Sequence, residues 1–114
     1  MADQALTKKE RLLARPDFEQ VLNLGSKHAV DRTCTLFFLP NQLGHKRLGI
    51  IASRKIGNAV VRNRAKRRIR EIFRRHKHLG EQGVDIVVIS ARKLVRLPYA
   101  ILEKKLTQTL QATR

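Results

Sequence analysis

Several residue types are scarce in this 114-residue sequence. It has one cysteine, Cys34, which excludes an internal disulfide and is typical of a reducing compartment, so we expect a cytoplasmic protein. No apolar run approaches the roughly 18 residues of a transmembrane helix, and the polar residues 1–9 lack the apolar region of a secretory signal. The length fits one domain over residues 1–114.

Acidic residues are also few, and their scarcity leaves a large positive charge. Lysine and arginine total 25 against nine acids, which gives a net charge of +16. Hydrophobic residues make up 42%, too many for a disordered basic tail. A charge of this size points to a polyanionic partner, nucleic acid first and an anionic membrane surface second.

The charge is concentrated in one segment. Residues 54–77 contain eleven basic residues and a single acid, Glu71, so they carry well over half of the net charge. Arginine outnumbers lysine there by eight to three, and guanidinium groups bind phosphate bidentately and stack on bases. A smaller basic group lies in residues 1–15, which we expect to form a flexible N-terminal segment.

Helical and strand patterns alternate along the chain. The strand at 84–90 has an unbroken apolar run, which indicates a central position in a sheet. Residues 27–32 either extend the first strand or form another. The predicted elements are a helix at 16–25, strands at 33–39 and 48–53 forming a hairpin, a helix at 59–79, a strand at 84–90, a basic loop at 91–97 and a helix from Pro98.

The helix at 59–79 is amphipathic. Its apolar residues fall within an arc of about 120° at 100° per residue, and most of its cations lie on the other side. This apolar stripe can fix the helix to the sheet while the cations face outward. Close packing of like charges is costly in the free protein, and bound phosphates would relieve it. The apolar residues are Val61, Ala65, Ile69, Ile72, Phe73 and Leu79.

Charge alone does not separate RNA from DNA. Alternation along the strand directs Phe37 and Phe38 to opposite faces of the sheet. One of them can join Phe18 in an apolar wall for single-stranded bases, although all three are equally compatible with a core. A structural, ribosomal-type RNA-binding protein and an architectural DNA-binding protein remain alternatives.

No pattern of catalytic or metal-binding residues is recognisable. Cys34 and the four histidines do not have the spacing of a metal site, and a glycine-rich phosphate loop and a nucleophile elbow are absent. The acids form no evident pair. We therefore expect no catalytic residue, no protein-bound metal and no other protein-bound cofactor.

One segment resembles a known family. Residues 48–73, LGIIASRKIGNAVVRNRAKRRIREIF, contain an Arg62-Asn63-Arg64 core and are similar to the signature of the bacterial ribonuclease P protein subunit. The likeness extends over nearly the whole chain, more loosely at the ends. It implies a protein that assists a catalytic RNA in cutting the 5′ leader from precursor tRNA. The partners would be that RNA and precursor tRNA, with Mg²⁺ held by RNA and substrate and with no membrane or obligate protein partner.

The resemblance also implies a fold. It is an α/β two-layer sandwich of order α-β-β-(β)-α-β-α, with a left-handed βαβ crossover. The general rule for βαβ units instead favours a right-handed connection if the two strands are parallel. Here we follow the family and expect the left-handed form.

Site residues follow from the resemblance by position. Leu22 stands where some relatives carry a second aromatic residue, and Phe37 where some carry tyrosine. The motif helix and its approach would bind RNA, and a cleft beside the first helix would receive the single-stranded leader. The RNA-binding residues would be Lys55, Arg62, Asn63, Arg64, Lys66, Arg67, Arg68, Arg70 and Arg74, and the leader cleft would comprise Phe18, Leu22, Phe37 and Arg54.

Overall fold

The computed structural model describes residues 6–112, and its element order confirms the predicted one. Residues 27–32 contribute most of a separate strand, β1. Of the two alternatives for this segment, the additional strand is therefore the correct one. The elements are η1 (Lys8–Glu10), α1 (Arg15–Leu24), β1 (Ser26–Val30), β2 (Cys34–Pro40), β3 (Arg47–Ile51), η2 (Arg54–Ile56), α2 (Ala59–Arg75), β4 (Val84–Ser90), η3 (Arg92–Arg96) and α3 (Tyr99–Ala112).

Two predicted details of these elements were wrong. The helix predicted to reach residue 79 ends at Arg75, and Leu79 packs against the core from the turn that follows. The basic loop at 91–97 contains a short 3-10 helix, η3. At Leu79 the hydrophobic pattern was read correctly, but a turn places that side chain against the core as well as a continued helix would.

The four strands form one sheet in the order β1-β2-β4-β3. The predicted hairpin between β2 and β3 is wrong, because β4 lies between them, antiparallel to β2 and parallel to β3. The hairpin joins β1 to β2 instead, through a turn in which Asp31 and Arg32 both have positive φ. β4 takes the centre because its side chains are apolar on both faces, and nearly all of them are buried.

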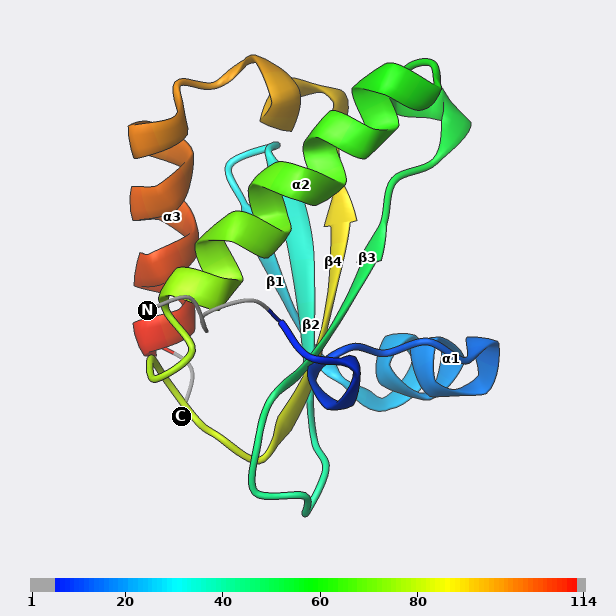
Figure 1. The fold of residues 1–114 in the computed structure, drawn as a ribbon, viewed down its shortest axis with the longest axis vertical. Helices are drawn as coiled ribbons and strands as arrows, with labels where there is room; N and C mark the ends of the chain where they lie inside the picture. Colours follow the sequence, from blue (N-terminus) through cyan, green and yellow to red (C-terminus); the bar gives the residue numbers. More distant parts are fainter. Residues whose placement is uncertain (1–5, 113–114) are drawn as a thin grey trace.

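The β3–α2–β4 connection is left-handed. In Figure 1 both strands run upward, α2 lies in front of the sheet, and β4 stands to the left of β3. The resemblance predicted this hand, and the general expectation of a right-handed crossover was wrong. Because β4 lies beside β2, the handedness of the crossover depends on which face of the sheet α2 covers. Helix α2 packs with α3 on the face opposite α1.

Each face of the sheet has its own apolar cluster. The larger cluster joins α2 and α3 to alternate sheet residues that include Leu36, Phe38 and Ile86. The smaller cluster lies on the α1 side around Val21 and Val87. Phe38 belongs to the first cluster and Phe37 packs against the second, as strand alternation predicted.

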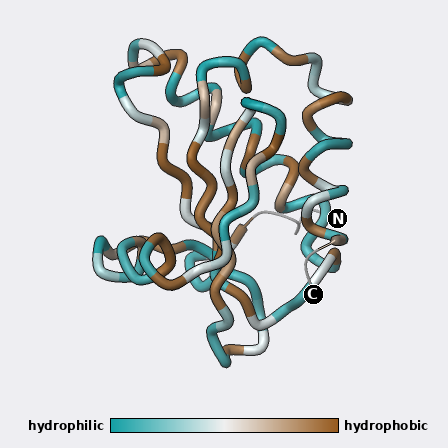
Figure 2. The backbone as a smooth tube through the Cα atoms, turned by 180° about the vertical axis from the view of Figure 1, so that it is seen from behind, coloured by the Kyte–Doolittle hydropathy of each residue, from teal (hydrophilic) through white to brown (hydrophobic). Residues whose placement is uncertain are grey.

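Helix α1 crosses only the lower end of its face of the sheet (Figures 1 and 2). Beyond it the apolar side chains of this face are only half-buried, among them Ile51 and Ile89. This face therefore combines a closed end under α1 with an open apolar end. We call the second part the open face.

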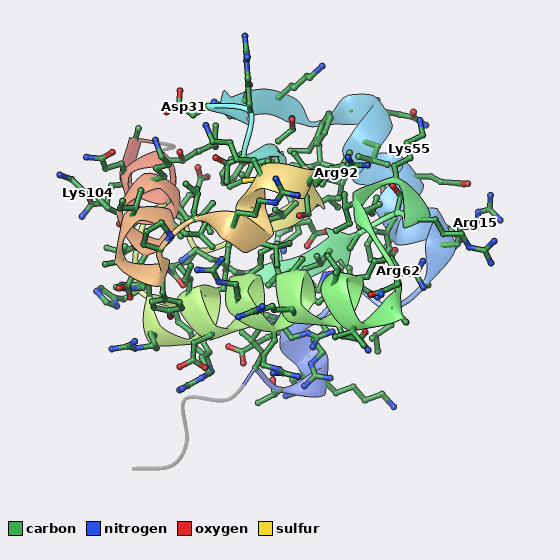
Figure 3. The ribbon with its side chains drawn as sticks, turned by 90° about the horizontal axis from the view of Figure 1, so that it is seen from above. Arg15, Asp31, Lys55, Arg62, Arg92 and Lys104 are labelled. Carbon is green, nitrogen blue, oxygen red and sulfur yellow. The ribbon has the colours of Figure 1, made fainter. Side chains whose placement is uncertain are left out.

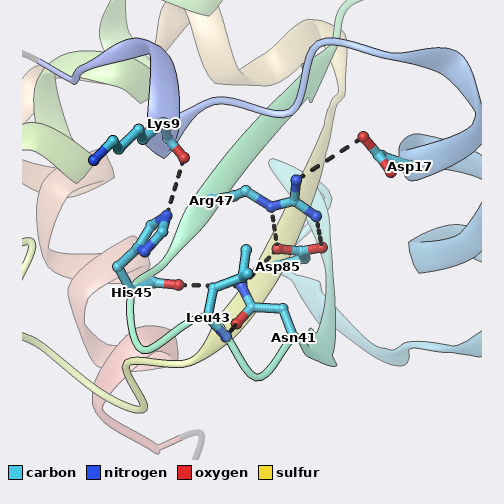
Figure 4. Close-up of polar contacts among 7 residues, drawn as sticks. All are labelled: Lys9, Asp17, Asn41, Leu43, His45, Arg47 and Asp85. Carbon is cyan, nitrogen blue, oxygen red and sulfur yellow. Dashed lines mark hydrogen bonds and ion pairs between the residues drawn. The ribbon is translucent and has the colours of Figure 1, made fainter.

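A buried ion pair fixes the sheet to α1 (Figure 4). Arg47 on β3 donates Nε to Oδ1 of Asp85 at 2.8 Å and Nη2 to Oδ2 at 2.7 Å. Asn41 donates to the same carboxylate at 2.7 Å, and Arg47 Nη1 lies 3.9 Å from the carboxylate of Asp17 on α1. Hydrogen bonding to Asp85 raises the pKa of Arg47. No local pattern indicates that these acids converge on one guanidinium, because Asp17 and Asp85 lie far apart in the chain.

Part of the basic N-terminal segment has defined contacts. Leu12 is buried, and its N–H donates to the carbonyl of Leu48 at 2.9 Å, while Lys77 pairs with Glu10 at 2.9 Å. The flexibility of residues 1–15 stays a prediction, and residues 1–5 of it lie outside the described residues. Within residues 6–112, no helix is long and apolar enough to cross a membrane.

Candidate nucleic-acid interface

Helix α2 is held in place by an N-terminal cap and by its buried apolar side. Asn58 caps its N-terminus by accepting a hydrogen bond from the N–H of Val61 at 3.0 Å. Along one side Ala65, Ile69 and Ile72 are completely buried against the sheet and α3. The apolar stripe predicted from the sequence therefore fixes the helix, and the remaining sides are available to a partner.

Most of the predicted RNA-binding side chains point away from the protein. Within residues 6–112, no hydrogen bond or ion pair uses these side chains, so the charges of the lysines and arginines among them are not neutralised locally. Lys55 lies on η2 and the other six lie on α2, and Figure 3 labels Lys55 and Arg62 among them. These residues are Lys55, Arg62, Asn63, Arg64, Lys66, Arg67 and Arg70.

Arg68 and Arg74 have partners inside the protein. Arg68 donates Nη1 to the carbonyls of Leu94 and Val95 at 2.8 and 3.0 Å, and Nη2 to that of Leu97, which ties η3 to α2. Burial, followed by the nearby charge of Arg64, lowers the pKa of Arg68. Arg74 makes a two-bond pair with Glu71 that lowers the pKa of this acid. Their contact with RNA stays a prediction, and the structure gives each a structural role.

A groove of about 150 Å³ separates α2 from the start of α1. Phe18 lies on one side of it, and Lys66 and Arg70 lie on the other, so an aromatic ring and two cations face the same space. We call it the Phe18 groove. Its lining is Leu6, Arg11, Leu12, Leu13, Phe18, Leu48, Gly49, Ile50, Lys66 and Arg70.

Gly49 decides where the ring of Phe18 lies. A Cβ at this position would stand 2.6 Å from Cε2 and 2.7 Å from Cζ of that ring, closer than any packing permits. The absence of a side chain therefore lets Phe18 lie directly against β3. Sequence reasoning missed Gly49, although a glycine inside an apolar strand is a known sign of such a close approach.

The residues predicted for the leader cleft are only partly brought together. Phe18, Leu22 and Phe37 all pack around the cluster of Val21 and Val87 and remain half-buried. Arg54 is exposed on η2, just after β3 ends, and no contact within residues 6–112 joins it to these three. Two aromatic rings and a leucine thus form one surface, with Arg54 beyond its far end.

Cys34 and the potential metal ligands are a separate possible source of chemistry. Burial raises the pKa of the Cys34 thiol to about 12, so it stays protonated at neutral pH and is a poor nucleophile or metal ligand. Across residues 6–112 no three His, Cys, Asp or Glu side chains gather as a metal ion would require. That the protein holds no metal or other cofactor remains a prediction.

These features, a cationic helix beside an apolar face on a small basic α/β fold, are typical of the class of nucleic-acid-binding proteins. A family model described as Ribonuclease P matches residues 6–114. Curated ribonuclease P protein components are similar: that of Thermotoga maritima is 43% identical over 91 residues (80% of this chain, 77% of the relative), and that of Petrotoga mobilis is 39% identical over 94 residues (82% and 79%). The chain belongs to the ribonuclease P protein family.

Solved structures agree with the fold. The ribonuclease P protein of Thermotoga maritima superposes with a TM-score of 0.83 at 37% identity, covering 92% of this chain and 98% of that one. That of Staphylococcus aureus gives 0.80 at 33% identity, covering 90% and 94%. The predicted fold class and the resemblance are thereby confirmed. Membership of the family associates the chain with RNA binding and tRNA processing.

Proposed function

We propose that this chain is the protein subunit of a bacterial ribonuclease P, acting in the cytoplasm with a catalytic RNA to remove the 5′ leader of precursor tRNA. Membership of the family supports the partnership with the RNA. The observation that carries the role in leader binding is the Phe18 groove, where an aromatic ring faces Lys66 and Arg70. Single-stranded RNA is bound by this combination of stacking and cationic groups.

The protein would act through two effects. The unpaired cations of α2 screen the repulsion between two polyanions, which lowers the ionic strength needed to bring them together. The Phe18 groove and the open face add contacts to the leader, which the precursor has and the mature product lacks. Precursor is then bound in preference to product without any protein side chain joining the chemistry.

Cleavage itself is assigned to the RNA. The enzyme is the complete ribonucleoprotein, an endoribonuclease, and Mg²⁺ would be held by the RNA and the substrate. The described residues show no ligand cluster for such an ion, so no step is derived through one on the protein. Neither a membrane nor an obligate protein partner enters the proposal.

The proposal is tested by reconstitution. The protein is mixed with bacterial ribonuclease P RNA and precursor tRNA at low Mg²⁺, and release of the leader is measured with and without protein. We expect release only when the protein is present. Binding to folded RNA without rescue would favour a structural RNA-binding protein, and tight binding to duplex DNA without rescue would favour an architectural DNA-binding protein.

Phe18→Ala is expected to weaken binding of precursor tRNA by the reconstituted enzyme about tenfold, the effect of losing one stacked base. Affinity for mature tRNA should hardly change, because mature tRNA has no leader. The measurement is equilibrium binding of both RNAs. Leu24→Ala is the control, since Leu24 is an exposed apolar residue on the same helix.

Phe18→Leu provides a second variant in case Phe18→Ala folds poorly. It keeps an apolar side chain against Gly49 but has no aromatic face, so it should also lose precursor affinity selectively. An equal loss for precursor and mature tRNA in both variants would remove Phe18 from the leader site.

A further inference from the structure

Lys46 is a cation that the function proposed above does not use. It lies immediately before β3, and its side chain is half-buried. Its Nζ donates a hydrogen bond to the backbone carbonyl of Lys77, just beyond the C-terminal end of α2. Within residues 6–112 no carboxylate pairs with this nitrogen, since Glu10 pairs with Lys77 instead. Lys46 is therefore an amine that the fold holds in place without a counter-ion.

Lys46 lines a small cavity with a largely apolar wall, which we call the Lys46 cavity. The core residues Leu48, Phe73 and Ile86 form part of this wall. Leu6 of the N-terminal segment also lines the cavity and packs against the core. Such surroundings remove water from an ammonium group, and burial lowers the pKa of Lys46 to about 8. At pH 7.5 about a quarter of the Lys46 side chains are then free amines, against about one in a thousand for an ordinary lysine.

The size of the Lys46 cavity limits what can be attached to the amine. The cavity has a volume of about 40 Å³. One water molecule needs roughly 10–15 Å³ of such space, so there is room for about three non-hydrogen atoms. An acetyl group consists of two carbons and one oxygen. The cavity can therefore accept an acetyl group on Lys46, but it is too small for a bulky acyl group such as benzoyl.

The charge around the cavity favours a donor that carries negative charge. Arg47 and Lys77 line the cavity with Lys46, and each has a carboxylate partner, Asp85 and Glu10 respectively. The chain as a whole carries a net charge of +16, so its field attracts anions to this surface. An acyl phosphate bears its negative charge on the leaving group, where cations stabilise the phosphate as it departs. Acetyl phosphate thus fits both the charge and the size of the site.

We propose that Lys46 is a site of covalent acetylation by acetyl phosphate, with the Lys46 cavity receiving the acetyl group. The ammonium group first loses one proton to water. The nitrogen then attacks the carbonyl carbon, a C–N bond forms, the C–O bond to phosphate breaks, and the proton shed by the nitrogen leaves on inorganic phosphate. The product is a neutral amide that retains one N–H for the carbonyl of Lys77, and the net charge of the protein falls by one.

The test is acetylation of the folded wild-type protein with acetyl phosphate, followed by peptide mass spectrometry. Lys104, an exposed lysine on α3, is the internal reference. At pH 7.5 we expect Lys46 to react about tenfold faster than Lys104, because its free-amine fraction is roughly 200 times larger while a less basic amine is a weaker nucleophile. The rate at Lys46 should level off above about pH 8, whereas that at Lys104 should continue to rise.

Two further measurements connect this rate to the cavity. In urea the cavity is lost, so Lys46 and Lys104 should react at equal rates. Benzoyl phosphate carries an acyl group larger than the cavity, so the folded protein should show little preference for Lys46 with this reagent. The proposal is overturned if Lys46 reacts no faster than Lys104 in the folded protein, or if its advantage persists in urea or is undiminished with benzoyl phosphate. No RNA takes part, so these results are independent of the reconstitution that tests the proposed function.

Discussion

Asp85→Ala is expected to destabilise the protein by about 3 kcal/mol. The change leaves the guanidinium of Arg47 without its carboxylate, in a place where only 24% of that side chain is exposed and only 7% of the Asp85 side chain was. When one partner of a buried ion pair is removed, the other charge keeps its desolvation penalty but loses the attraction that offset it. Partial access of water to Arg47 keeps the loss of stability at the lower end of the usual range. The measurement is urea unfolding followed by circular dichroism.

Glu19→Ala is the control for this prediction. Glu19 pairs with Arg15 at 3.1 Å on the surface of α1, and both side chains are largely exposed. Exposed pairs of this kind contribute less than about 1 kcal/mol. If Asp85→Ala lowers the free energy of unfolding no more than Glu19→Ala does, the Arg47–Asp85 pair is not what holds β3, β4 and α1 together.

The double change Arg67→Ala/Arg70→Ala is expected to weaken assembly with ribonuclease P RNA at least tenfold at physiological salt. Both side chains are exposed and have no partner within residues 6–112, so their loss costs the free protein little. Two fewer phosphate contacts should reduce the slope of log affinity against log salt by about 1.5 units. Filter binding over a range of salt concentrations measures both quantities.

Lys27→Ala/Lys104→Ala is the matched control, since it removes the same charge from β1 and α3, outside both α2 and the Phe18 groove. It should leave the affinity and the slope nearly unchanged. Equal losses in the two double variants would mean that net charge alone attracts the RNA, and α2 would then have no special place in the interface.

Much of the fold was predictable because local patterns agree with it. The unbroken apolar run of residues 84–90 predicted the central strand, and the stripe of α2 predicted how that helix packs. Pairing was less predictable, since the β2–β3 hairpin was wrong and β4 lies between those strands. Two strands that are neighbours in sequence tend to pair, but the most apolar strand gains most from the central position.

The candidate site, like the fold, was predictable from the sequence only in part. Composition and the 3.6-residue period show that α2 is a cationic helix fixed by an apolar stripe, but they treat its cations as equivalent. The structure separates them: Lys66 and Arg70 face Phe18, Arg64 faces η3, and Arg68 binds the carbonyls of η3. Neighbours that come from distant parts of the chain decide this, and helical periodicity contains no information about them.

The sequence by itself determined the kind of partner, because net charge and the arginine-rich helix are properties of composition and local spacing. Tertiary structure alone decided the shape of the interface. It set the ring of Phe18 against Gly49 and paired Arg47 with Asp85. Each of these contacts joins residues far apart in the chain, so it exists only once the sheet and its left-handed crossover have formed.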